Sequence, residues 1–207
     1  MRNLHYDISH VIYWILFKIF FSFRTIGWRN VPKEGAVILA SNHASYLDPP
    51  LIGNGTLRRL NYVAKEELFN RPWKRFILTL WGGIPINRDK FDKASLKRIM
   101  ECIKAGKALV IFPEGTRGPD GELLPAKPGT GMLVSMAKCP VVPVYVKGSY
   151  RSLGKVHRKL HLFVPITVIY GKPMEFPEVE GEQSRDRYQR ITDEIMAAIA
   201  DLKREHA

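Results

Sequence analysis

Cysteine is scarce in this sequence, and repeated patterns are missing. Cys102 and Cys139 are the only cysteines among 207 residues, and neither stands at a metal-ligand or redox spacing. A disulfide-stapled scaffold and a cysteine-based metal centre are therefore excluded, and we expect two reduced, buried thiols in a reducing compartment. The absence of low-complexity stretches and of internal repeats also excludes solenoids and other repeat arrays.

Long apolar runs are missing too. The longest, residues 11–23, is interrupted by Lys18 and Ser22 and falls short of the roughly 20 residues that a membrane-spanning helix needs. A cleaved signal peptide would end in small residues, whereas Arg24 and Trp28 follow here. On a helical wheel the polar residues form one narrow stripe: Asp7, His10, Trp14, Lys18, Ser22 and Thr25. We predict that residues 1–29 form an amphipathic, membrane-associating helix, with a soluble core helix as the alternative.

Acidic residues are outnumbered. The chain has 20 Asp and Glu against 32 Lys and Arg, a formal net charge of +12. Such a surplus favours nucleic acid, anionic lipid headgroups or phosphorylated substrates as partners. No zinc-finger, RNA-recognition or basic-zipper pattern is present, so no nucleic-acid partner is expected. A non-enzymatic basic protein that binds nucleic acid or acidic lipid remains the alternative from a different functional class.

What the sequence does contain is an alternation of apolar strands and helices. Strand-like runs occur at residues 35–41, 60–64, 84–87, 108–112, 141–147 and 166–170. Helical patterns occur at residues 70–80, 91–105, 131–137 and 183–205. Strands that are apolar throughout indicate a sheet covered on both faces. We therefore predict one α/β domain over residues 30–207, with a mixed, mostly parallel sheet and helices on both faces.

The loop after the first predicted strand carries a candidate catalytic pair. Its sequence, NHASYLD, places Asp48 five residues after His43. In a strand-to-helix turn the carboxylate can reach the near ring nitrogen and leave the other nitrogen free as a base. By itself the pair is a weak signal, because a surface histidine beside a helix-capping aspartate would look the same.

Cations follow three other predicted strands. Arg117 and two glycines lie in FPEGTRG, which begins where residues 108–112 end, Arg88 lies in GGIPINRD after residues 84–87, and Lys65 follows residues 60–64. Arginine offers a forked donor for phosphate, and glycine lets backbone N–H groups approach a ligand. A glycine turn with a surface ion pair would also explain the FPEGTRG loop. Three cations beside a His–Asp loop nevertheless favour a phosphate site next to a general base.

The set NHASYLD, GGIPINRD, FPEGTRG and VVPVYVKGS resembles, in order and spacing, the four blocks of the glycerolipid acyltransferases. The resemblance covers about residues 35–173 and is closest to the bacterial lysophosphatidate acyltransferases. It implies that His43 is the general base and Asp48 its orienting partner. It assigns the phosphate and pocket residues as Lys65, Arg88, Glu114, Gly115, Thr116 and Arg117, and the acyl or donor side as Val142, Pro143 and Lys127. A plain core strand at residues 141–145 is equally compatible with the sequence.

The resemblance further implies transfer of a fatty acyl group from an acyl thioester to the free hydroxyl of 1-acyl-glycerol 3-phosphate. The donor, acyl-CoA or acyl-carrier protein, stays open, as do glycerol 3-phosphate or another lysolipid as acceptor and a hydrolase that uses water. A covalent acyl-Ser45 is a minor alternative, because no G-x-S-x-G elbow exists. No cofactor is expected, and no metal, since His157 and His161 have no third ligand nearby.

Residues 69–81 interleave cations with aromatic residues. Arg71, Lys74 and Arg75 alternate with Trp73 and Phe76 in this stretch. Such a helix could dock the protein on anionic lipid, although a solvated cationic helix would have the same composition. We therefore expect a peripheral or monotopic protein at the cytoplasmic face of the cell membrane.

Overall fold

The computed structural model describes residues 4–87, 92–157 and 159–206. Its strands are β1 (Arg24–Ile26), β2 (Val37–Ser41), β3 (Leu60–Lys65), β4 (Gly83–Ile86), β5 (Ala108–Ile111), β6 (Val141–Lys147) and β7 (Thr167–Tyr170). Its α-helices are α1 (Leu4–Phe21), α2 (Asp48–Asn54), α3 (Pro72–Leu80), α4 (Lys93–Lys104), α5 (Gly129–Ala137), α6 (Ser149–Leu153) and α7 (Ser184–Glu205). Two short 3-10 turns, η1 (Trp28–Asn30) and η2 (Glu66–Phe69), complete the elements.

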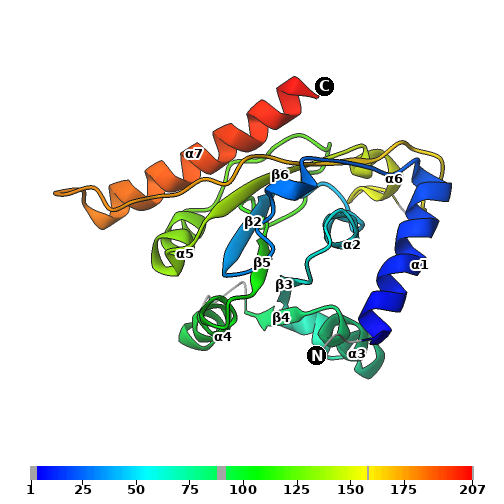
Figure 1. Cartoon of the computed structure of the whole chain (residues 1–207), viewed down its shortest axis with the longest axis horizontal. Helices are drawn as coiled ribbons and strands as arrows, with labels where there is room; N and C mark the ends of the chain where they lie inside the picture. Colours follow the sequence, from blue (N-terminus) through cyan, green and yellow to red (C-terminus); the bar gives the residue numbers. More distant parts are fainter. Residues whose placement is uncertain (1–3, 88–91, 158, 207) are drawn as a thin grey trace.

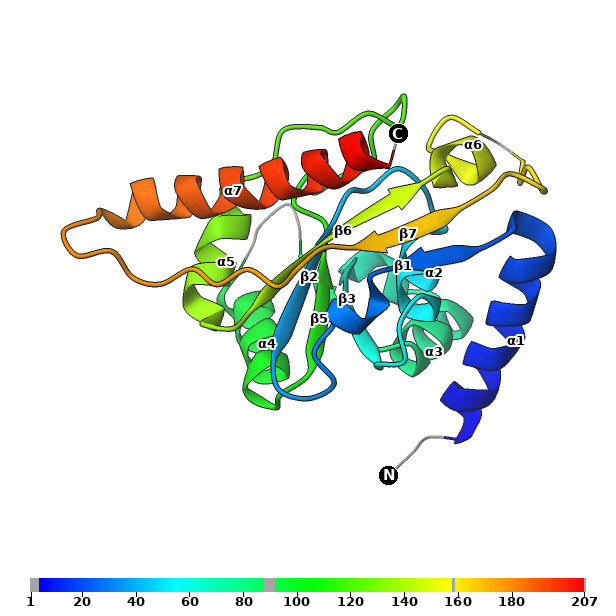
Figure 2. The ribbon, with the colours of Figure 1, turned by 45° about the horizontal axis from the view of Figure 1, so that its top comes forward.

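The strands of the described residues form one seven-stranded sheet in the order β1-β7-β6-β2-β5-β3-β4 (Figures 1 and 2). All neighbours are parallel except β6 and β7, which are antiparallel. The central strands β2 and β5 are buried along their whole length, which explains why their sequences are apolar throughout. The predicted α/β class with a mostly parallel sheet is confirmed. The carboxyl ends of β2, β3, β4, β5 and β6 share one edge, so the loops that follow them meet there.

Helices cover both faces of the sheet. Alternate strand residues point to opposite faces and build two buried clusters. One cluster packs against α1 and α2 through Phe17, Phe21, Leu51 and Ile52. The other packs against α4, α5 and α7 through Ile99, Ile103, Leu133, Val134, Ile191, Ile195 and Ile199. Both layers are needed because a parallel sheet exposes no polar face.

The N-terminal helix is shorter than the predicted stripe. Helix α1 ends at Phe21, because Ser22 adopts the left-handed backbone conformation with φ of 44°. Thr25 belongs to β1, which pairs in parallel with β7, so Ser22 and Thr25 do not extend a helical stripe. On the helix, His10 Nε2 lies 3.2 Å from the carbonyl oxygens of both Gly53 and Thr56 and therefore faces α2. Among the helices of the described residues, none combines the length and apolar content needed to cross a bilayer.

Two short helices were not predicted from the sequence. Helices α2 and α6 have seven and five residues, too few to produce a recognisable helical period. Helices α3, α4, α5 and α7 were predicted within two residues of their ends. Helix α4 begins at Lys93, because the Asp92 side chain caps it by accepting the backbone N–H of Ser95 at 2.8 Å. Phe91, which we placed in this helix, lies outside the described residues.

Candidate active site

The loop that carries His43 is fixed where it leaves the sheet. Asn42, which is buried, donates its side-chain amide to the carbonyl of Val146 at 3.3 Å and accepts the Val146 N–H at 2.7 Å. The side chain thus continues the ladder between β2 and β6 beyond its last backbone pair, Ser41 and Val144. This anchor sets the starting point of the loop. Sequence reasoning assigned no role to Asn42, because only the neighbouring strand reveals what its amide contacts.

One oxygen of Asp48 organises the loop itself. Its Oδ2 lies 2.9 Å from Nδ1 of His43 and accepts the backbone N–H groups of Ala44 and Ser45, both at 2.7 Å. The carboxylate is fully buried, and Oδ1 has no hydrogen-bond partner among the described residues. Because Oδ2 already accepts two N–H groups, this contact suits the tautomer that carries its hydrogen on Nδ1, in which Nε2 keeps its lone pair. The structure thus brings together the two residues predicted to form the catalytic pair.

Glu114, which belongs to the FPEGTRG loop, connects that loop to the loop that carries His43. Its Oε1 accepts the backbone N–H of His43 at 2.9 Å, and its Oε2 accepts that of Leu124 at 3.0 Å. A further link runs from the N–H of Gly118 to the carbonyl of His43 at 3.1 Å. Burial raises the pKa of Glu114, although the two backbone hydrogen bonds oppose this shift. Both oxygens hold the backbone of the site, so Glu114 shapes it and does not line the cavity beside His43.

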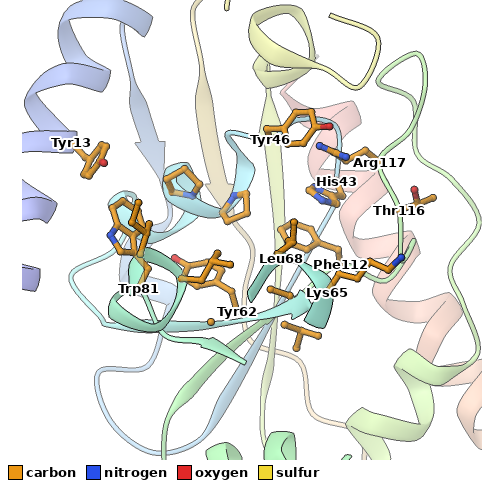
Figure 3. Close-up of a pocket in the computed structure, with 17 residues that line it drawn as sticks. Tyr13, His43, Tyr46, Tyr62, Lys65, Leu68, Trp81, Phe112, Thr116 and Arg117 are labelled. Atoms are coloured by element: carbon orange, nitrogen blue, oxygen red, sulfur yellow. The ribbon is translucent and has the colours of Figure 1, made fainter. Parts of the chain in front are cut away.

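A cavity of about 550 Å³ opens beside the imidazole (Figure 3). The His43 side chain is 12% exposed, and its ring stacks on Phe112 with 3.9 Å between ring centroids. Four of the predicted site residues line this cavity: His43, Lys65, Thr116 and Arg117. Lys65 is the last residue of β3, and the other three lie in the loops after β2 and β5, so the sheet edge assembles them from distant parts of the sequence.

The two described cations of the predicted phosphate site are held differently. The guanidinium of Arg117 lies over the ring of Tyr46, 3.4 Å from its centroid. This stacking leaves the edge of the fork available for an anion. Lys65 forms an ion pair with Glu67 at 2.9 Å, in which both side chains are substantially exposed. Arg88, the third predicted cation, lies outside the described residues.

The far part of the cavity is apolar and was not predicted. Its walls come from α1, α2, β3, η2, α3 and the turn after α3: Tyr13, Pro49, Pro50, Tyr62, Leu68, Ile77, Leu78 and Trp81. Tyr13 and Trp81 meet edge to face with ring centroids 4.7 Å apart, which joins α1 to the end of α3 (Figure 3). Tyr13 and Trp81 lie in the two segments that we predicted to contact the membrane, residues 1–29 and 69–81. They also line the cavity because of the way α1 and the end of α3 pack against each other, and the helical pattern of the sequence does not specify this packing.

The remaining predicted residues lie apart from this cavity. Gly115, with φ of +68°, lies against the Lys127 side chain, and both residues line a neighbouring cavity of about 260 Å³. Val142 and Pro143 are buried inside β6, and neither lines the cavity beside His43. Val142 and Pro143 therefore agree with the alternative, in which residues 141–145 form a plain core strand. An apolar strand in the middle of a sheet packs against both helix layers and has no surface left for a ligand.

Three other potentially reactive side chains, those of Ser45, Cys102 and Cys139, do not line this cavity. The hydroxyl of Ser45 donates to the carbonyl of Leu153 at 2.8 Å and accepts the N–H of Leu47 at 3.1 Å, and the residue is fully buried. A nucleophilic serine would need an exposed oxygen. Cys102 and Cys139 are free thiols, and burial raises both pKa values, that of Cys139 to about 11. Among the described residues, no three His, Cys, Asp or Glu side chains are grouped as metal ligands.

Comparison with known proteins agrees with this geometry. Residues 22–147, which include the whole histidine loop, match the family model described as Acyltransferase. The chain belongs to the acyltransferase family. This acyltransferase is 29% identical over 175 residues to a protein of Bacillus subtilis named 1-acyl-sn-glycerol-3-phosphate acyltransferase, covering 84% of both chains. It is 31% identical over 208 residues to a Saccharomyces cerevisiae protein of the same name, covering 94% of this chain and 68% of the relative.

The acyltransferase also matches a solved structure in its fold. The crystal structure of PlsC from Thermotoga maritima, described as a 1-acyl-sn-glycerophosphate (LPA) acyltransferase, superimposes with a TM-score of 0.71 at 24% sequence identity. The match covers 98% of this chain and 84% of that one. Relatives from plants are longer, since the chain spans 51% of the chloroplast 1-acyl-sn-glycerol-3-phosphate acyltransferase of Brassica napus.

Proposed function

We propose that this acyltransferase moves a fatty acyl group from an acyl thioester to the free hydroxyl of 1-acyl-glycerol 3-phosphate, forming phosphatidate. The observation that carries the proposal is a single cavity with a charged end and an apolar arm. His43, which Asp48 contacts from inside the protein, and two cations line the charged end, and aromatic and aliphatic side chains line the arm. A lysophosphatidate has the same division, with a phosphate at one end and an acyl chain at the other. Relatives named for this acceptor support the assignment.

The proposed chemistry is direct transfer without a covalent enzyme intermediate. Nε2 of His43 takes the proton of the acceptor hydroxyl while its oxygen attacks the thioester carbonyl carbon. The new C–O ester bond forms, the C–S bond breaks, and the proton passes from the imidazolium to the departing thiolate. Asp48 stabilises the imidazolium, and a positioned base of this kind contributes roughly 10² to 10⁴-fold in rate. Arg117 and Lys65 hold the phosphate, so the hydroxyl is presented to Nε2.

Either acyl-CoA or acyl-carrier protein fits as the donor, because both carry the acyl group on a phosphopantetheine thiol and both are anionic. The net charge of +12 suits either partner. We further propose that no cofactor takes part, since a thiolate is a good leaving group. Glycerol 3-phosphate remains the second candidate acceptor; the apolar arm favours the acyl-bearing one.

We also propose that the protein works peripherally or monotopically at the cytoplasmic face of the membrane. Helix α1 buries Phe17 and Phe21 but leaves one long apolar face exposed, formed by Ile8, Val11, Ile12, Ile15, Leu16 and Ile19, and Tyr13 and Trp14 are exposed beside it. Helix α3 likewise exposes Trp73, Phe76 and Ile77. Tyr13 and Ile77 also line the cavity, so a lipid acceptor could enter between these helices without leaving the bilayer.

The reaction is tested by thiol release from palmitoyl-CoA with and without 1-acyl-glycerol 3-phosphate. We expect release only with the acceptor and phosphatidate as product. Replacing the donor with palmitoyl-acyl-carrier protein, or the acceptor with glycerol 3-phosphate, separates the remaining candidates. The His43→Ala variant should lose about 10³-fold in rate, whereas the control His206→Ala should match the wild type. Thiol release that is equally fast without any acceptor would identify a hydrolase and contradict the proposal.

Membrane docking is tested with vesicles. Replacing Arg71, Lys74 and Arg75 with glutamine should weaken binding to phosphatidylglycerol vesicles, by about 1 kcal/mol per cation. The matched control replaces Lys93, Lys97 and Lys104 of α4 with glutamine, because α4 packs on the face of the sheet opposite α1 and α2. Equal binding by the two triple variants would rule out the α3 contact.

A further inference from the structure

The loop between α6 and β7 exposes an unusual amount of apolar surface. Residues 155–157 and 159–163 within this connection are referred to below as the α6–β7 loop. Phe163 is 73% exposed and Val156 is 59% exposed, and Leu160 and Leu162 are exposed as well. Single exposed apolar residues are common on protein surfaces, but four within nine positions form a patch that needs an explanation.

This exposure is imposed by the backbone of the loop. The Phe163 backbone has φ of 61°, a left-handed conformation that bulky side chains rarely adopt. Its N–H donates to the carbonyl of Phe20 at 2.7 Å, and the His161 N–H donates to the carbonyl of Ser152 at 2.8 Å. The Ser152 hydroxyl also donates to the His161 carbonyl at 2.8 Å. Hydrogen bonds therefore hold a strained backbone in a shape that turns its aromatic side chain outward.

The loop continues the exposed apolar face of α1. The rings of Phe163 and Phe20 lie 6.1 Å apart between centroids, at the carboxyl end of the helix. Ile19, one residue earlier, is 60% exposed. In Figures 1 and 2 the yellow loop lies beside the carboxyl end of the blue helix α1. Trp81, which follows α3, contacts Tyr13 farther toward the amino end of the helix.

The charges of the loop favour an anionic partner. Lys155 and Lys159 are exposed, and neither has an ion pair among the described residues. No acidic residue occurs between residues 155 and 163. Apolar side chains interleaved with unpaired cations match an anionic lipid surface, where the apolar groups enter the acyl region and the cations remain at the headgroups.

We propose that the α6–β7 loop is a second lipid-binding element, which inserts Phe163 and its apolar neighbours into an anionic bilayer beside the carboxyl end of α1. The inference rests on the proposed membrane function and extends it. Together, α3 and the α6–β7 loop would contact the bilayer near the two ends of α1. Two separated contacts fix the tilt of the protein, and thereby the direction in which the cavity beside His43 faces the lipid.

The decisive variant is Phe163→Gly in the full chain. Glycine adopts a positive φ without strain, so this variant should melt at or above the temperature of the wild type while losing the aromatic ring. Its affinity for vesicles of phosphatidylcholine with phosphatidylglycerol should fall about tenfold. Val179→Gly is the matched control, because Val179 is 53% exposed in the segment before α7 and should alter vesicle binding less than twofold.

A variant that lacks the two lysine charges of the loop tests whether the loop prefers anionic headgroups. Replacing Lys155 and Lys159 with glutamine should weaken binding to the anionic vesicles about fivefold per lysine and leave binding to pure phosphatidylcholine unchanged. Unchanged vesicle binding by both Phe163→Gly and the double lysine variant would overturn the proposal. A dimer in sedimentation velocity that dissociates in Phe163→Gly would also overturn it, because the patch would then bind a second copy of the chain.

The activity assay separates this inference from the proposed function. With acceptor dispersed in detergent micelles, Phe163→Gly should transfer acyl groups at the wild-type rate, because Phe163 does not line the cavity beside His43. With acceptor embedded in vesicles, its rate should fall in parallel with its binding. If the wild type transfers no acyl group in either assay, the proposed function fails, while the vesicle-binding comparison still decides the role of the loop.

Discussion

The two edges of the sheet are held by opposite charges. At the carboxyl edge, the carboxylates of Asp48 and Glu114 accept backbone N–H groups from the loops of the site. At the amino edge, the guanidinium of Arg58 donates to the carbonyls of four residues just before β2 and β5: Pro32, Glu34, Gly35 and Gly106. Charged side chains therefore serve at both edges as hydrogen-bond partners for backbone groups outside the strands, two carboxylates at the carboxyl edge and one guanidinium at the amino edge.

The two edges differ in whether the residues held there leave a polar group available to bind a ligand. Arg58 points all of these donors at the protein itself, and burial lowers its pKa. At the other edge the carboxylate of Asp48 also orients an imidazole whose second nitrogen faces a cavity. Charged side chains stabilise loops at both edges, but only at the carboxyl edge does one of them, Asp48, also contact an imidazole that lines a cavity. Mutations at the two edges should therefore separate activity from stability.

The largest effect on activity is expected for Asp48→Asn. An amide can still accept the N–H groups of Ala44 and Ser45, but it carries no charge to stabilise the imidazolium. We expect kcat to fall about a thousandfold. Initial rates and a thermal melt measure both consequences, with Asp201→Asn on the surface of α7 as the control. A loss in rate that is matched by a collapse of the melting temperature would show that Asp48 is only a structural hub.

The next largest effect is expected for Arg117→Ala, which removes a cation from the cavity and leaves the backbone anchors intact. The KM for the phosphate-bearing acceptor should rise about 10 to 100-fold, with kcat changed far less. Arg117→Lys should recover part of this loss, because a point charge lacks the forked geometry. Arg151→Ala, an exposed arginine of α6, serves as the control. A change confined to kcat would contradict phosphate binding by Arg117.

A smaller effect is expected for Glu114→Gln. Glutamine keeps one acceptor oxygen, so one of the backbone N–H groups of His43 and Leu124 would face an NH₂ group. The histidine loop should lose part of its fixed position, lowering kcat about tenfold while the acceptor KM stays near the wild-type value. Steady-state kinetics distinguish this outcome from direct phosphate contact, which would appear mainly in KM.

The smallest effect on activity, and the largest on stability, is expected for Arg58→Ala. Removing the guanidinium leaves carbonyl groups at the amino edge without donors, and the free energy of unfolding should fall by about 2–3 kcal/mol. Urea denaturation measures this loss, and Arg59→Ala, one residue away, is the control. Acyl-transfer rates at a temperature well below the melting point should stay close to the wild type. A large loss of rate in the folded variant would mean that the two edges are coupled.

Local sequence predicted much of the fold and part of the site. The apolar strands and the longer helices were recognisable from their periods, because burial on both faces removes polar residues from a strand. His43 and Asp48 were recognisable because both lie in one loop, only five positions apart. Lys65, Thr116 and Arg117 were recognisable because each follows a predicted strand, and parallel strands end at a common edge.

Other parts could not be predicted because they depend on the packing of distant segments. The clamp of Asn42 on Val146 spans 104 positions, and that of Glu114 on His43 spans 71. The apolar arm required Tyr13 of α1 to meet Trp81 beyond α3. Val142 and Pro143 show the converse case, since the resemblance assigned them to the acyl or donor side while the structure buries them inside β6.

The sequence by itself determined the class of fold, the loop that holds His43 and Asp48, and the cationic character of the molecule, because apolar periodicity, the spacing of two residues and a count of charges can all be taken from the linear chain. Only the tertiary structure decided which carboxylates hold backbone and which one orients the imidazole. It also decided which apolar residues form a cavity and which ones form the core or the surface. The physical reason is that a hydrogen bond or a cavity wall needs two partners in space, and a linear pattern specifies only one of them.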